Sequence, residues 1–123
     1  MPGRFQGNLP ERTFQFALFV LNIVDELPNN TKGWVWAKQL ARAGASIGAN
    51  VREANEAFTE ADFTHKCSIA RKEASETYYW IRLCYEARLI SDETAMKAMQ
   101  EADEILRILS AIVKKTQAHL AAC

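Results

Sequence analysis

The chain has 123 residues, 49% hydrophobic and 24% charged, so it holds enough apolar material for one folded domain spanning 1–123 and lacks the profile of a disordered segment. Fifteen Lys and Arg balance fifteen Asp and Glu, and this neutral balance excludes the global attraction to nucleic acid of a strongly basic domain. The N-terminal sequence lacks the order of a signal peptide, and the longest apolar stretch is far shorter than the ~20 residues that span a bilayer. We therefore expect a cytoplasmic protein without a membrane segment.

Turn residues divide the chain into four helical segments, with no run of strand-like alternation. Pro10 suits a first helical turn, and Pro28 marks the end of the first helix. Thr59 and Asp62 have capping-box order, and Ser91 can cap the last helix. Short connections make neighbouring helices antiparallel, so the pattern predicts an all-α, up-and-down four-helix bundle. The expected helices span about 10–27, 34–56, 59–89 and 91–120.

The first predicted helix carries apolar residues on two opposite sides. One side holds Phe14, Leu18 and Leu21. The other side, about 200° away, holds Phe16, Val20 and Ile23. Either this helix sits centrally and is covered by its own chain, or one side meets another copy. The pattern favours self-association.

The second helix carries two glycines and a polar stripe between residues 42 and 53. At about 100° per residue, the stripe falls within roughly 80° and consists of Arg42, Ser46, Asn50 and Glu53. Gly44 and Gly48 stand one turn apart, and each costs ~1 kcal/mol relative to Ala in a helix interior. Close packing of another backbone at both positions would offset this cost. The same stretch spells Gly-x-Ser-x-Gly, but a nucleophile elbow requires a strand-to-helix turn, which the helical context excludes.

The third helix places acidic residues toward the core. Glu73 lies on the inward seam with Thr77 and Cys84, and Glu76 lies about 60° from that line. An inward carboxylate needs a cation, and the polar stripe of the second helix offers Arg42, whose guanidinium can satisfy a carboxylate through two hydrogen bonds. We interpret these residues as a structural polar network. Paired acids in general acid–base catalysis remain the alternative.

Metal and cofactor chemistry lacks its usual residues. A di-iron bundle needs two Glu-x-x-His motifs, whereas only Asp62 precedes a histidine, His65, at that spacing. The three cysteines form no Cys-x-x-Cys pair, so we expect reduced thiols at Cys67, Cys84 and Cys123. We expect no catalytic residue, no metal and no cofactor.

Basic residues gather on the second helix. Between residues 32 and 52 there are four basic residues and no acidic ones. Arg42 is assigned to the polar network, which leaves Lys32, Lys38 and Arg52 as candidate nucleic-acid contacts. In an oligomer this basic stripe would repeat and could follow a phosphate backbone. Ordinary solvated surface is the alternative interpretation.

The second and third helices together resemble one protein family. The matching residues of the second helix are Arg42, Ser46, Ile47, Asn50, Val51 and Glu53. Those of the third are Phe63, Lys66, Ile69, Ala70, Lys72, Glu73, Ala74, Glu76, Thr77, Tyr79, Trp80 and Ile81. In this order they resemble the four-helix bundle family named for 23S rRNA intervening sequences, whose relatives include the accessory variability (Avd-like) proteins of diversity-generating retroelements.

This resemblance implies an assembly and a role. Members of the family are ring-like homopentamers without a catalytic signature, so we expect a non-enzymatic homo-oligomer, most simply a pentamer. The resemblance also implies a nucleic-acid or ribonucleoprotein accessory factor, with RNA or DNA as partner. The alternative is a homo-oligomeric scaffold that binds an unidentified protein and no nucleic acid.

Overall fold

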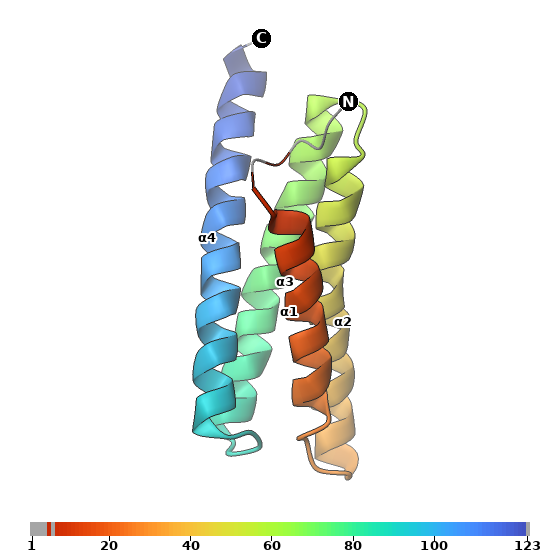
Figure 1. The fold of residues 1–123 in the computed structure, drawn as a ribbon, viewed down its shortest axis with the longest axis vertical. Helices are drawn as coiled ribbons and strands as arrows, with labels where there is room; N and C mark the ends of the chain where they lie inside the picture. Colours follow the sequence, from red (N-terminus) through yellow and green to blue (C-terminus); the bar gives the residue numbers. More distant parts are fainter. Residues whose placement is uncertain (1–4, 6, 123) are drawn as a thin grey trace.

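Four α-helices make up the fold (Figure 1). The computed structural model describes residue 5 and residues 7–122. The helices are α1 (Leu9–Val24), α2 (Thr31–Asn55), α3 (Glu60–Glu86) and α4 (Asp92–Ala122). They lie side by side as a bundle, and the described residues contain no strand. The predictions of an all-α class and of four helices are confirmed.

Contacts between helices show how the chain folds back on itself. On α1 and α2, Gly44 faces Val20 whereas Gly48 faces Thr13. Between α2 and α3, Arg42 binds Glu73 whereas Glu53 binds Lys66. In both pairs, residue numbers rise along one helix as they fall along its neighbour. Figure 1 shows α4 beside α3, with its C-terminal end beyond the start of α1.

The start of α2 differs from the expected position. The helix begins at Thr31, three residues before the expected Trp34, because the Asn30 side chain caps it by accepting a hydrogen bond from the Gly33 N–H at 3.0 Å. A Cβ at Gly33 would lie 1.8 Å from the carbonyl oxygen of Pro28. Glycine is therefore required at position 33 because the backbone of Pro28 approaches it closely. The residue lies within the helix, whereas the sequence placed it in the preceding loop.

The ends of α1 and α3 also come earlier than expected. α1 ends at Val24, and tighter turns carry the chain to Pro28 through hydrogen bonds from the N–H groups of Glu26 and Leu27. α3 ends at Glu86, followed by Arg88 with a φ of 61°. The N–H groups of Arg88 and Leu89 bond the carbonyls of Tyr85 and Cys84, which is the Schellman pattern. Arginine occupies the position where glycine is usual, so no sequence signal marked this end.

The core runs through all four helices. Its largest fully buried side chains are Phe16, Ile23, Leu40, Ile47, Ile81, Ile105 and Leu109. The starts of α3 and α4 are capped locally, with Thr59 Oγ1 accepting from the Asp62 N–H at 3.0 Å and Ser91 Oγ from the Thr94 N–H at 3.2 Å. Among the described helices, none is long and apolar enough to cross a membrane.

Candidate functional site

The two apolar sides of α1 have different fates. Phe16, Val20 and Ile23 are no more than 2% exposed and belong to the core. On the other side, Phe14 is 56%, Leu18 42% and Leu21 48% exposed. Within the part of the chain that the structure describes, α1 is therefore covered on one side and exposed on the other. Its outer side is an apolar surface of the kind that marks interaction sites.

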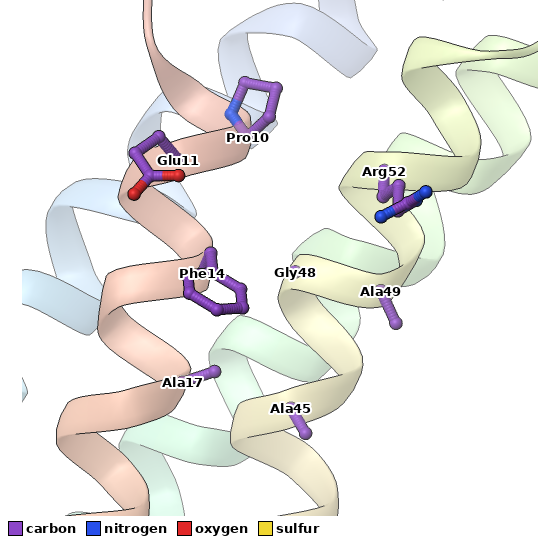
Figure 2. A pocket seen from close by; sticks show the side chains of 8 residues that line it. All are labelled: Pro10, Glu11, Phe14, Ala17, Ala45, Gly48, Ala49 and Arg52. Atoms are coloured by element: carbon purple, nitrogen blue, oxygen red, sulfur yellow. The ribbon is translucent and has the colours of Figure 1, made fainter.

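A groove separates this outer side from α2 (Figure 2). It has a volume of about 310 Å³ and is lined by Pro10, Glu11, Phe14, Ala17, Ala45, Gly48, Ala49 and Arg52. Figure 2 shows Phe14 between the two helices, with Ala45, Gly48 and Ala49 along α2. The small residues of α2 keep the groove open, whereas Phe14 supplies an aromatic wall. Only Glu11 and Arg52 bring charge to its lining.

The two glycines of α2 permit the close approach of α1. A Cβ at Gly48 would lie 3.3 Å from the Thr13 carbonyl oxygen, so here α2 faces the backbone of α1. A Cβ at Gly44 would lie 2.7 Å from Cγ1 of Val20. Gly44 therefore accommodates a buried, stiff β-branched side chain rather than a backbone. Both glycines lie at the α1–α2 contact, and Gly48 also lines the groove.

Basic residues border the same face of α2. Lys38 and Arg52 are exposed, and Arg52 also lines the groove. They are fourteen residues apart, which is roughly 21 Å along a helix. Lys32 lies near the start of α2, with its ammonium 5.2 Å from the Trp36 ring centroid. One subunit thus offers a few widely spaced cations, two of which flank apolar surface.

Arg42 joins α2 to α3. Its guanidinium bonds Glu73 at 3.0 Å and also bonds Glu76, which in turn accepts from the Trp80 indole N–H at 3.3 Å. The Glu73 side chain is only 9% exposed. The arrangement explains how an ionised carboxylate is held at the core, because a buried charge requires a partner.

The rest of the predicted polar network separates into local contacts. The Asn50 amide donates to the Ser46 carbonyl at 2.8 Å and to its hydroxyl at 3.4 Å, both within α2. Glu53 pairs with Lys66 of α3 at 3.2 Å on the surface. The six predicted residues therefore do not form one continuous network. Of the six, only Arg42, Glu73 and Glu76 bond one another across the helix pair.

One contact of comparable size escaped sequence analysis. Arg12 of α1 binds Glu101 at 2.6 Å and Glu104 at 2.9 Å on α4, and hydrogen bonding to Glu101 raises the pKa of the guanidinium. The two glutamates are three residues apart and therefore share one helix face. That spacing was the only available signal, and it does not identify a cation so distant in sequence.

The side chains that could act as nucleophiles, bases or metal ligands lie apart from one another. Ser46 lies within α2 and its hydroxyl contacts Asn50, while His65 is exposed and His119 contacts Glu60 at 2.8 Å. Among the described residues, no three His, Cys, Asp or Glu side chains gather as metal ligands.

The two described cysteines are free and buried. Burial raises the pKa of Cys67 to about 12 and that of Cys84 to about 11, so both thiols stay protonated at neutral pH. The third predicted thiol, Cys123, lies outside the described residues.

Comparison with known proteins places this architecture in a family. A family model described as 23S rRNA-intervening sequence protein matches residues 8–111, which include most of the bundle. The chain belongs to the 23S rRNA-intervening sequence protein family. No curated protein matches the chain.

A solved structure agrees with this membership. The chain is similar to the crystal structure of a protein of unknown function from the S23 ribosomal protein family of Bacteroides thetaiotaomicron VPI-5482. The two share 38% sequence identity and superpose with a TM-score of 0.81, and the match covers 87% of this chain and 99% of that chain. The family name and its structural relative define a fold, and neither supplies an activity.

Proposed function

We propose that this member of the 23S rRNA-intervening sequence protein family is a non-catalytic accessory protein that acts as a homo-oligomer and contacts nucleic acid or ribonucleoprotein. The observation that carries the proposal is the apolar outer side of α1, with Phe14, Leu18 and Leu21 all more than 40% exposed beside a groove. We further propose kinship with the Avd-like accessory proteins of diversity-generating retroelements, with an antiparallel up-and-down bundle and a ring-like homopentamer as the assembly.

Self-association follows from the two-sided apolar pattern of α1. Burying a Leu or Phe side chain stabilises an assembly by about 1.5–3 kcal/mol, and three such side chains lie along one helix. The exposed Trp34 and Val35 extend the apolar surface at the start of α2. A second copy of the chain carries the same apolar surface and is always present at the same concentration, so it is a suitable partner for this surface.

Nucleic-acid contact follows from the basic residues of α2. Each phosphate neutralised by Lys or Arg releases condensed counterions, so binding weakens steeply with salt. With a formal net charge of +0 and few exposed cations on α2, one subunit has little to offer. Repetition of Lys32, Lys38 and Arg52 around a ring would multiply the contacts without new residues.

Two measurements test the proposal. Light scattering on a sizing column should give a mass several times the 13.9 kDa chain, and a monodisperse monomer would overturn it. Fluorescence anisotropy with short RNA and DNA should show weak binding at low salt that Lys38→Glu and Arg52→Glu remove. Lys97→Glu is the matched control, because Lys97 is exposed on α4 and bonds Glu93. Binding that is indifferent to all three substitutions would contradict the role of the stripe.

The second candidate function is a protein-interaction scaffold. It is favoured by the position of Arg52, which lines the apolar groove and would be covered there by a protein partner. An oligomer that binds neither RNA nor DNA at low salt would make this function the better account.

A further inference from the structure

Phe58 is the most exposed large apolar side chain of the described residues, at 99% of its surface. It lies in the short connection between α2 and α3. Hydrogen bonds hold the backbone on both sides, from the Ala57 N–H to the Ala54 carbonyl before it and from the Asp62 N–H to Thr59 Oγ1 after it. The ring is therefore presented to solvent by a fixed backbone.

A second groove of the molecule has the complementary character. It has a volume of about 420 Å³ and is lined by Phe5, Phe63, Ile108, Ala111, Ile112, Lys115 and Thr116. Phe5 packs against Phe63 with ring centroids 5.2 Å apart, which forms one aromatic wall. The Thr116 hydroxyl already bonds the carbonyls of Ile112 and Val113. The lining therefore accepts an apolar side chain without leaving that hydroxyl unpaired.

Charge matches across the two features. The segment around Phe58 carries acidic and no basic residues from position 53 to position 62, namely Glu53, Glu56, Glu60 and Asp62. The groove lining contains one charged residue, Lys115, which is exposed. The groove beside α1 is less suitable for an acidic segment, because Glu11 is part of its lining.

Both features lie at the same end of the bundle. Figure 1 shows the α2–α3 connection and the C-terminal part of α4 at one end, and His119 of α4 contacts Glu60 at the start of α3. A contact between the same end of successive copies repeats by rotation without a step along the bundle. Such a heterologous contact forms a ring when its rotation closes after a whole number of copies.

We propose that Phe58 of one copy inserts into the Phe63–Ile108–Ile112 groove of the next copy, with Lys115 facing the acidic segment around Phe58. This contact rests on the proposed self-association and specifies one of its interfaces. The described residues leave the Phe58 ring uncovered, and none of their side chains fills the groove.

Site-specific cross-linking tests the contact directly. In a Cys123→Ala background, a tagged chain with Phe58→Cys is co-expressed with an untagged chain with Ala111→Cys and then oxidised. We expect a covalent dimer of tagged and untagged chains, because Ala111 is exposed and lines the groove. The matched control replaces Ala111→Cys by Met96→Cys, which is exposed near the other end of α4. Equal cross-linking in both pairs would overturn the contact.

A dilution series gives a second, independent test. Phe58→Ser should raise the concentration at which the oligomer dissociates at least tenfold, while Met96→Ser leaves it unchanged. Lys115→Glu should weaken the oligomer, and Glu56→Lys added to it should restore part of the loss. If the wild-type chain is a monomer throughout, self-association and this contact both fail. If it is an oligomer that Phe58→Ser does not weaken, only this contact is wrong.

Discussion

The α2–α3 pair and helix α1 use the same kinds of residue to different effect. On α2 and α3, apolar positions such as Ile47 and Ile81 are fully buried, and Arg42 reaches a carboxylate that is 9% exposed. On α1, the large apolar side chains of Phe14, Leu18 and Leu21 are exposed, and Arg12 binds two carboxylates that are 28% and 50% exposed. The first region pairs its most buried charge within the helix pair, whereas the second leaves one apolar side of its helix exposed.

This difference shows where stability and interaction are located. Interior side chains are held by packing density and paired charge. Helix α1 is held on one side by glycine contacts with α2 and by one ion-pair cluster with α4. We therefore expect substitutions in the α2–α3 pair to have the largest effect on the free energy of unfolding. Substitutions on the outer side of α1 should have the larger effect on the stability of the oligomer.

The largest effect should come from Arg42→Met. It leaves Glu73 buried without its cation, and we expect the free energy of unfolding to fall by about 2–4 kcal/mol. Urea unfolding at fixed protein concentration measures it. Arg82→Met is the control, because Arg82 pairs with Glu86 at 3.9 Å with both side chains about two-thirds exposed, and its loss should cost less than about 0.5 kcal/mol. Equal effects of the two substitutions would contradict the comparison.

The second effect concerns the buried thiols of α3. Their pKa values are raised by burial, to about 12 at Cys67 and about 11 at Cys84. Each buried thiol therefore makes its full contribution to the free energy of unfolding below the unfolded-state pKa near 9. This contribution is lost as the pH rises through the folded-state pKa. Each should lower the free energy of unfolding by about 1 kcal/mol between pH 9 and pH 10.

The pH series is repeated with Cys67→Ala and Cys84→Ala. Either substitution shifts the whole curve by the cost of the cavity, but it should also make the alkaline part less steep. If the free energy of unfolding of both variants fell with pH as steeply as that of the wild-type chain, ionisation of the buried thiols would not be the cause of the alkaline loss. At pH 8, a thiol reagent should modify them no faster than the protein opens.

The third effect distinguishes the two glycines at the α1 contact. Gly44→Ala places a methyl 2.7 Å from Val20 Cγ1, and overpacking of this kind costs about 1–3 kcal/mol against a gain of ~1 kcal/mol in helix propensity. Gly48→Ala meets the Thr13 carbonyl oxygen at 3.3 Å and should be nearly neutral. Adding Val20→Ala should relieve Gly44→Ala, which a double-mutant cycle would detect. Additivity in that cycle would rule out the steric explanation.

The smallest effect should come from Arg12→Met. The pair with Glu101 is partly exposed, so we expect a loss of about 0.5–1 kcal/mol that shrinks as salt is added. Arg107→Met is the matched control, because Arg107 bonds Asp103 on the same helix with 77% of its side chain exposed. A loss from Arg12→Met as large as that from Arg42→Met would show that α1 is not the weaker region.

Local signals in the sequence were sufficient for the helices and for one ion-pair cluster. Thr59 and Ser91 cap where their spacing indicated, and an inward Glu73 required a cation that only the polar stripe of α2 could offer. Gly33 and Arg88 were missed because each occupies a position where another kind of residue is usual. Gly33 lies inside a helix, where glycine is unfavourable, and Arg88 adopts the left-handed conformation that glycine usually adopts after a helix.

Long-range features could not be predicted in the same way. The Arg12–Glu101 pair depends on the axial register of the short α1 relative to α4, and no local residue spacing determines that register. Asn50 bonds its own helix through an i−4 contact, which competes with any cross-helix network. The groove at Phe14 and the exposure of Phe58 depend on which of several apolar faces the chain covers, so they too required the structure.

The separation of Arg12 from Glu101 by 89 residues also has a consequence for biosynthesis. Of the four helices, α1 leaves the ribosome before the others, and its anchor on α4 is translated roughly 4–18 seconds later at ordinary elongation rates. During that interval the buried and the outer apolar sides of α1 are both unprotected, and docking on α2 alone covers only part of them. Nascent α1 therefore exposes apolar surface until the later helices are in place.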